Sequence, residues 1–189
     1  MKRLPAPPIR IDPTEEYIAI LDTAKGKASF KLFSPRIETL VNSFIFLATE
    51  EYYANTTFHR VVDGLLIQGG DPEGTGEGGP GYYLDDGFAG FRHGPGTLSM
   101  ANCGPNTNGS QFFVTLVNAP WLDGKYSIIG ELIDGMETLT EIRQGDALLS
   151  LTVRARRFGK RRALTWDEIV QHWKDVNQDQ KKNDLRGRA

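Results

Sequence analysis

The side chains that could do chemistry concentrate in residues 58–113. Arg60 and Gln68 stand there among apolar residues in the stretch FHRVVDGLLIQGGDP, and the nearly uncharged stretch GTLSMANCGPNTNGSQFF follows. Together the two stretches carry one arginine and few other titratable groups. Such a set suits binding and polarising a neutral group, and it does not suit proton shuttling or nucleophilic attack.

Nucleotide and calcium sites are poor alternatives for this region. Residues 74–79, GTGEGG, satisfy a dinucleotide-binding glycine pattern, but Pro80 follows where a helix should begin, and Glu77 would repel a pyrophosphate. A calcium loop that starts at Asp71 would need a glutamate where Tyr82 stands. We therefore expect no metal ion and no cofactor.

The histidines and the cysteine have no metal-ligand spacing. We expect His59 to be a hydrogen-bonded structural histidine instead of a general base. Cys103 has no neighbouring positive charge that would activate its thiol, so a small buried residue is the better interpretation. No Gly-x-Ser-x-Gly elbow surrounds Ser99 or Ser110, and a hydrolase would lack its nucleophile.

Length and composition indicate one domain with extensions. The chain has 189 residues, 39% of them hydrophobic, and many of its 21 glycines fall in residues 64–109, which indicates tight turns near a functional surface. Residues 1–150 hold 11 basic and 19 acidic residues, whereas residues 151–189 hold 11 and 5. The single cysteine excludes an internal disulfide, and no run approaches 18 apolar residues. We expect a cytoplasmic monomer without a membrane partner.

The pattern along the chain predicts many short strands and few helices. Residues 1–16 are proline-rich and should form an extended arm, and residues 17–33 should form a hairpin that turns at Gly26. Ser34 and Pro35 resemble the start of a helix with an apolar stripe, and a second short helix should follow Gly135. Strand-like segments within residues 60–69, 96–102, 110–116, 126–133 and 149–156 favour a sandwich or a barrel.

The C-terminal extension, residues 158–189, is basic and should contain a helix at about residues 165–177. A cluster of six cations spans the junction between the predicted domain and this extension: Arg154, Arg156, Arg157, Lys160, Arg161 and Arg162. Alternation with apolar residues puts the first arginines on the solvent face of a strand, and no interleaved aromatics offer base stacking. We expect no nucleic-acid partner.

Five motifs together carry a family resemblance. They are FHRV at residues 58–61, QGGD at 68–71, LSMAN at 98–102, GPNTNGSQFF at 104–113 and WLDGK at 121–125. With these motifs the chain resembles a cyclophilin-type peptidyl-prolyl cis-trans isomerase over residues 17–157. The resemblance implies a mainly β fold: a closed eight-stranded antiparallel β-barrel capped by two helices, at residues 34–48 and 136–143.

The resemblance also implies site residues. Arg60 would be the catalytic cation and Gln68 its orienting neighbour. The substrate-binding residues would be Phe58, Leu65, Leu66, Met100, Ala101, Asn102, Gln111, Phe113, Trp121, Leu122 and Tyr126. Many relatives have Phe and Met at the positions of Leu65 and Leu66, and His at that of Tyr126. These departures bear on substrate preference and on binding of a cyclosporin-type inhibitor.

The activity implied is rotation about the X-Pro bonds of proline-containing peptides and of unfolded or folding proteins. The barrier to rotation comes from amide resonance, so no bond has to break. A cation near the prolyl nitrogen can favour the twisted state, in which that nitrogen gains a lone pair. The alternative is a module that binds proline-containing loops and whose turnover is incidental.

Overall fold

The computed structural model describes residues 3–34 and 36–157. Nine strands occur in this part of the chain: β1 (Glu15–Thr23), β2 (Gly26–Leu32), β3 (Thr56–Thr57), β4 (Arg60–Val62), β5 (Leu66–Gly69), β6 (Thr97–Met100), β7 (Phe112–Thr115), β8 (Ile128–Asp134) and β9 (Ala147–Arg157). The helices are α1 (Glu38–Thr49), the short 3-10 helix η1 (Pro120–Leu122) and α2 (Met136–Glu141). The helix expected at residues 165–177 lies outside the described residues.

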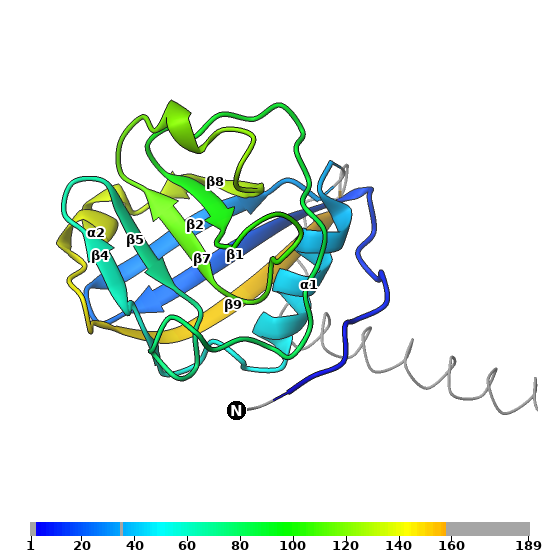
Figure 1. The fold of residues 1–189 in the computed structure, drawn as a ribbon, viewed down its shortest axis with the longest axis horizontal. Helices are drawn as coiled ribbons and strands as arrows, with labels where there is room; N and C mark the ends of the chain where they lie inside the picture. Colours follow the sequence, from blue (N-terminus) through cyan, green and yellow to red (C-terminus); the bar gives the residue numbers. More distant parts are fainter. Residues whose placement is uncertain (1–2, 35, 158–189) are drawn as a thin grey trace, which may run out of the picture.

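The strands form one curled antiparallel sheet in the order β3-β9-β1-β2-β8-β6-β7-β5-β4 (Figure 1). Its two edge strands, β3 and β4, are consecutive in the chain, and Phe58 and His59 alone separate them. The ends of the sheet therefore meet through the chain itself. The resemblance implied eight closed strands, and that number is recovered when β3 and β4 are counted as one interrupted strand.

The first hairpin has the form that the sequence predicts. Inward residues of β1 such as Ala19 and Leu21 are fully buried, and they alternate with half-buried residues along the strand. Thr23 pairs with Gly26 at the turn, where Gly26 has a φ of 134° that an L side chain rarely adopts. The period of two and the glycine thus fix which face of the hairpin enters the core.

The helix α1 covers one end of the curled sheet, and α2 lies near the other end (Figure 1). The predicted apolar stripe of α1 is confirmed, because Leu40, Val41, Phe44, Leu47 and Ala48 are all buried. The predicted start at Ser34 is wrong, since the helix begins at Glu38. The Ser34 side chain is buried and its hydroxyl lies 3.5 Å from the Glu15 carbonyl oxygen, so it caps no helix.

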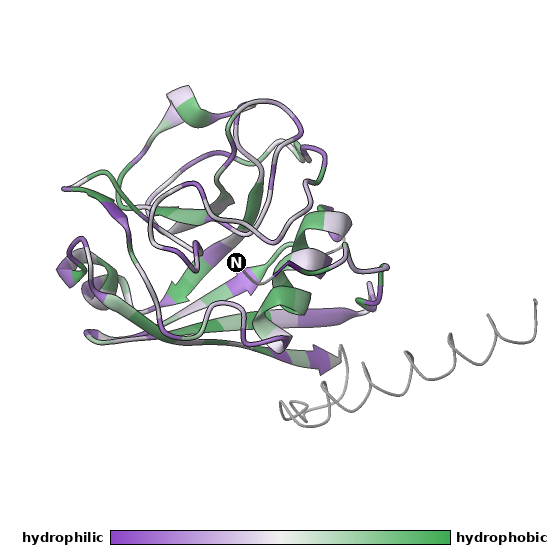
Figure 2. Ribbon diagram, turned by 60° about the horizontal axis from the view of Figure 1, so that its bottom comes forward, coloured by the Kyte–Doolittle hydropathy of each residue, from purple (hydrophilic) through white to green (hydrophobic). Residues whose placement is uncertain are grey.

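The core fills the inside of the curled sheet and the surface beneath α1, as the apolar strands and helix of Figure 2 show. The N-terminal arm runs over this body in an extended form. Its backbone is fixed by hydrogen bonds from Leu4 N to Pro80 O at 2.8 Å and from Arg10 N to Asn42 Oδ1 at 2.8 Å. The arm is therefore bound to the domain before β1 begins.

Candidate active site

The site is organised by a row of paired residues that crosses four strands. Arg60, the first residue of β4, pairs with Gln68 of β5. Gln68 pairs with Phe113 of β7, which in turn pairs with Ser99 of β6. Because directly paired residues project on the same face of a sheet, these four side chains share one face. Four separate sequence motifs thus meet through strand register.

The Arg60 guanidinium is held by a relay of two amides. Its Nη1 donates to Gln68 Oε1 at 3.1 Å, and Gln68 Nε2 donates to Gln111 Oε1 at 3.0 Å. Gln111 Nε2 donates to the carbonyl oxygens of Gly76 at 2.8 Å and Gly78 at 3.0 Å. The direction of each amide is fixed by this order of donors and acceptors, and Arg60 itself remains exposed.

The loop whose carbonyl oxygens accept hydrogen bonds from Gln111 is held in place by the carboxylate of Asp71, which is 0% exposed. This carboxylate accepts hydrogen bonds from backbone N–H groups at residues 73, 75, 76 and 78, at 2.7–3.2 Å. Burial alone would raise the pKa of Asp71, but these backbone hydrogen bonds outweigh it and lower the pKa. The N–H groups of the GTGEGG stretch that Asp71 uses are therefore not available to a phosphate.

Phe113 forms the floor of the apolar part of the site. It is 3% exposed, and its ring stacks on His93 with centroids 5.8 Å apart and planes at 11°. The Tyr126 ring meets Phe113 edge-on at 5.3 Å. Two neighbouring rings therefore fix the orientation of the Phe113 ring.

His93 belongs to a buried polar network that the sequence analysis did not identify. Its Nδ1 donates to Asp123 Oδ1 at 2.8 Å, and its Nε2 lies 3.2 Å from Ser99 Oγ. Burial lowers the pKa of His93, although the hydrogen bond and charge of Asp123 act in the opposite direction. Ser99 is 0% exposed and donates to Ser127 O at 3.0 Å, so its hydroxyl is closed to solvent. This Asp-His-Ser arrangement supports Phe113 from below.

The remaining predicted residues fall into two groups. Trp121 is 55% exposed and Leu122 is half-buried on η1, while Ala101 and Asn102 follow β6 directly. The side-chain amide of Asn102 donates to Lys125 O at 3.1 Å, which joins this segment to the one after η1. Leu66 is the first residue of β5, two residues before Gln68, and Leu65 directly precedes the strand.

Met100 and Phe58 differ from the others because both lie inside the core. Met100 is 1% exposed and pairs with the buried Phe112, on the face of β6 opposite Ser99. Phe58 is 0% exposed between β3 and β4. The structure therefore does not bring these two side chains to the surface beside Arg60.

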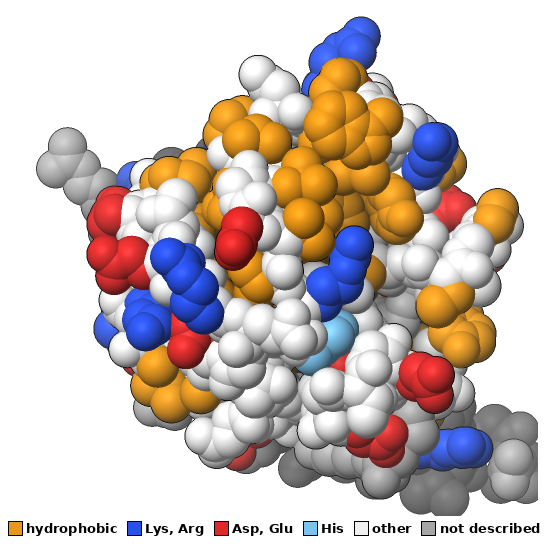
Figure 3. All heavy atoms as spheres, turned by 60° about the vertical axis from the view of Figure 1, so that its left-hand side comes forward, with side chains coloured by type: hydrophobic (Ala, Val, Ile, Leu, Met, Phe, Trp, Pro, Cys, Tyr) orange, Lys and Arg blue, Asp and Glu red, His pale blue; other side chains and the backbone are white. Residues whose placement is uncertain are grey.

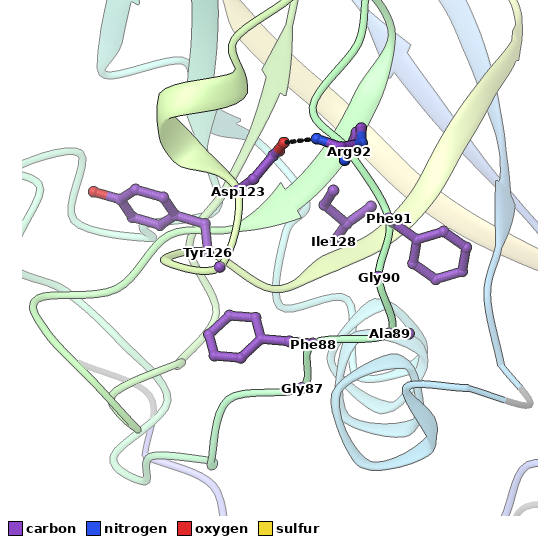
Figure 4. Close-up of a pocket in the computed structure, with 10 residues that line it drawn as sticks. Gly87, Phe88, Ala89, Gly90, Phe91, Arg92, Asp123, Tyr126 and Ile128 are labelled. Atoms are coloured by element: carbon purple, nitrogen blue, oxygen red, sulfur yellow. Dashed lines mark ion pairs between the residues drawn. The ribbon is translucent and has the colours of Figure 1, made fainter.

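Two cavities flank the row. The larger, of about 480 Å³, is lined by Gln68, Gln111, Ala101, Asn102 and residues of the 76–83 loop. The smaller, of about 230 Å³, is lined by Phe88, Tyr126 and Ile128, beside an ion pair in which Arg92 Nη1 lies 3.5 Å from Asp123 Oδ2 (Figure 4).

Hydrophobic side chains also gather on one face of the molecule, next to basic side chains (Figure 3).

Three expectations outside the row can be compared with the structure. The alternation in β9 is confirmed, since Arg154 and Arg156 are exposed. Cys103 is exposed, so its predicted burial is wrong; it sits in a turn held by a hydrogen bond from its backbone N–H to Thr107 Oγ1. His59 contacts the 71–78 loop, and burial lowers its pKa, but within the described residues its ring nitrogens have no partner of hydrogen-bond geometry.

Comparison with known proteins gives one consistent result. Residues 18–157 match the model of the family described as cyclophilin type peptidyl-prolyl cis-trans isomerase/CLD. The chain is 46% identical over 125 residues to peptidyl-prolyl cis-trans isomerase-like 1 of Gibberella zeae, which covers 64% of this chain and 77% of that protein. It is 47% identical over 121 residues to an isomerase of Schizosaccharomyces pombe, with 61% and 78% covered.

Solved structures agree with the sequence comparisons. A cyclophilin-type isomerase from Cryptosporidium parvum superposes with a TM-score of 0.69 at 37% identity, over 73% of this chain and 97% of that one. A second structure of that protein, solved in the presence of the dipeptide Ala-Pro, gives a TM-score of 0.68. In the described part of the chain, no helix is long and apolar enough to cross a membrane.

Proposed function

Because this chain belongs to the family of cyclophilin-type peptidyl-prolyl cis-trans isomerases, we propose that Arg60 accelerates rotation about X-Pro bonds and that Gln68 orients it. The isomerase activity is that of the family. The assignment to individual residues rests above all on the register that sets Arg60, Gln68 and Phe113 side by side.

Arg60 acts on the electronic origin of the barrier. Rotation about a peptide bond costs about 18–20 kcal/mol because resonance with the carbonyl is lost. As the bond twists, the prolyl nitrogen becomes pyramidal and gains a lone pair that can accept a hydrogen bond. A guanidinium beside this nitrogen interacts with the twisted state more strongly than with either planar isomer, which is differential binding of the transition state.

The apolar side chains hold the proline ring while the bond turns. In this proposal Phe113, Leu122, Tyr126, Leu65 and Leu66 contact the ring. The flanking chain lies along Ala101, Asn102, Gln111 and Trp121, and the backbone of Asn102 holds it. Met100 and Phe58 contribute by packing beneath the site, in keeping with their burial. The substrates are proline-containing peptides and folding proteins, and the relative studied with Ala-Pro supports this class.

The size of the effect requires more than one interaction. Uncatalysed exchange takes about 10–100 s, so a rate of about 10³ s⁻¹ would need the barrier lowered by about 7 kcal/mol. A charge-assisted hydrogen bond contributes about 1.5–3 kcal/mol. The rest must come from desolvation and from positioning of the ring, for which the His93–Phe113–Tyr126 stack is suited.

Substitution of Arg60 tests the proposal. We expect Arg60→Ala to lower kcat/KM for an Ala-Pro peptide at least 100-fold, measured by NMR exchange spectroscopy without a coupled protease. Arg60→Lys keeps the charge but loses the planar donor pair, and we expect it to recover only a small part of the activity. The far-UV spectrum and unfolding midpoint should stay unchanged because Arg60 is exposed. Full turnover by the alanine variant would refute the role of Arg60.

A second candidate function is the capture of proline-containing loops without a need for turnover. It is favoured by three exposed aromatic side chains at the cavities and on η1: Tyr83 at 73%, Phe88 at 55% and Trp121 at 55%. In an aggregation assay with an unfolded client, Arg60→Ala should protect as well as wild type if capture is the main role. The exposed Trp121 indole also gives a fluorescence signal for titration with cyclosporin.

A further inference from the structure

The larger cavity contains a side chain that comes from far away in the sequence. Arg3 of the N-terminal arm lines it together with Gln68 and Gln111, the two amides that orient Arg60. The stem of Arg3 packs on Gly81, where a Cβ atom would come within 3.1 Å of Arg3 Cγ. The arm thus completes a wall of the cavity.

The position of Arg3 is fixed by its neighbours along the arm. The next residue, Leu4, donates its backbone N–H to Pro80 O at 2.8 Å. Asn42, which is 1% exposed, accepts from Arg10 N at 2.8 Å and donates to Pro8 O at 3.0 Å. Ile11 is buried in the core. The buried amide of Asn42 thus bonds the arm at two points, and the prolines of the arm restrict its backbone. Together these features hold Arg3 at the cavity.

The charge of Arg3 is not neutralised within the described residues. Arg3 and Glu77 are the two charged residues among those that line the cavity, and neither forms an ion pair with any described residue. Glu77 belongs to the exposed loop above Asp71, whereas Arg3 comes from the arm. The cavity therefore presents one cationic and one anionic group to whatever enters it.

We propose that Arg3 is a specificity-determining residue that favours an acidic side chain shortly before the X-Pro bond. This inference rests on the proposed role of Arg60. The residue before proline is bonded to the prolyl nitrogen, which faces Arg60 in that proposal. The preceding chain then leaves the proline ring on the side of Arg60, Gln68 and Gln111, toward the cavity that Arg3 lines. A carboxylate two residues before proline reaches the guanidinium of Arg3.

Glu77, which lines the same cavity, should affect substrate preference in the direction opposite to Arg3. As a carboxylate at the same cavity, it disfavours an acidic substrate side chain and favours a basic one. Removal of each charge should therefore shift selectivity in opposite directions. A general effect of net charge would also shift selectivity in these two directions, so the proposal further requires that removal of a charge away from the cavity leaves selectivity unchanged.

The test compares three peptides, Xaa-Ala-Pro-Phe with Glu, Lys or Gln as Xaa, at low ionic strength and with free ends blocked. The quantity measured is the ratio of kcat/KM for the Glu peptide to that for the Lys peptide. We expect Arg3→Gln to lower this ratio about threefold, and Arg3→Glu to lower it about as much again, as exposed ion pairs would predict. Glu77→Gln should raise it, and salt near 0.5 M should remove most of the difference.

The matched control is Lys27→Gln, which removes one positive charge near the start of β2, at a residue that does not line the cavity. We expect it to leave the ratio unchanged. A ratio that stays the same in Arg3→Glu, with normal turnover of the Gln peptide, overturns the inference and leaves the role of Arg60 standing. Turnover that survives Arg60→Ala would instead overturn the proposed function, whatever the ratio.

Discussion

The carboxylate of Asp71 gives the sharpest test of how the site is held. It fixes the 72–78 loop, the loop carbonyls hold Gln111, and Gln111 holds Gln68 against Arg60. We predict that Asp71→Asn lowers both the stability of the domain and its activity, although Asp71 itself is buried and lines neither of the two cavities. The change keeps the size of the side chain and alters only its charge and one acceptor.

The expected loss can be worked out bond by bond. Backbone N–H groups of Thr75, Gly76 and Gly78 donate to Oδ2, and that of Glu73 donates to Oδ1. An asparagine can keep its oxygen toward the first three and must then set its NH₂ group against the Glu73 N–H. Three charge-assisted bonds become neutral ones, at about 0.5–1 kcal/mol each, and the Glu73 N–H, whose bond is partly buried, loses its acceptor, at about 1–3 kcal/mol. The sum is about 2.5–6 kcal/mol.

Urea denaturation and an isomerisation assay on the full chain measure the two effects. We expect an unfolding free energy lower by about 2.5–6 kcal/mol and a kcat/KM lower by at least tenfold under conditions where the variant remains folded. The matched control is Asp134→Asn, an exposed carboxylate at the end of β8, which should change neither quantity. An Asp71→Asn variant with wild-type stability would refute the assignment of these bonds, and full activity in a destabilised variant would refute the relay to Arg60.

Three further predictions follow from the same contacts. Gly78→Ala should disturb the loop without changing its charge, because a Cβ there would lie 1.8 Å from Asp71 Oδ1; limited proteolysis should cut residues 72–78 faster than in wild type. His93 has a pKa lowered by burial from the usual 6.5, so the unfolded chain binds more protons below that pH, and stability should fall as the pH falls from 7 to about 5.5. His93→Gln should reduce this pH-dependent loss, measured by thermal unfolding. Gln68→Glu should form an ion pair with Arg60 and lower kcat/KM at least tenfold, most clearly at low ionic strength.

Local patterns predicted the elements whose burial follows a simple period. The hairpin around Gly26 and the apolar stripe of α1 are examples, since each depends on residues a few positions apart. The start of α1 was mispredicted because Ser34 has a tertiary partner, the carbonyl of Glu15, which no local pattern reveals. The break between β3 and β4 likewise depends on distant partners, because β3 pairs with β9 and β4 with β5, and the local sequence FHR does not reveal these pairings.

The sequence predicted which residues belong to the site. How their side chains are arranged depends on the register of the strands, which the sequence did not reveal. Ser99 and Met100 are neighbours in one motif, yet the pairing of β6 with β7 sets Ser99 opposite Phe113 and Met100 opposite Phe112. Since successive residues of a strand face opposite sides, only one of the two can lie beneath the Phe113 ring. The resemblance assigned Met100 to the pocket. The polar network through Ser99 and His93 went unnoticed because His93 lies 6 residues from Ser99 and 30 residues from Asp123, and each looks like an isolated polar residue in the sequence.

The chemistry of the relay explains why amides, and not carboxylates, stand next to the cation. Arg60 forms no ion pair within the described part of the chain, and its side-chain partner is the neutral Gln68. A carboxylate at position 68 would bind the guanidinium more tightly, but it would also neutralise the charge of Arg60 before a substrate binds. The buried carboxylate that stabilises the region, Asp71, bonds backbone N–H groups instead. The arrangement separates the buried carboxylate from the cation. Under the proposed role of Arg60, this leaves its charge available for a nitrogen that becomes basic only as its amide twists.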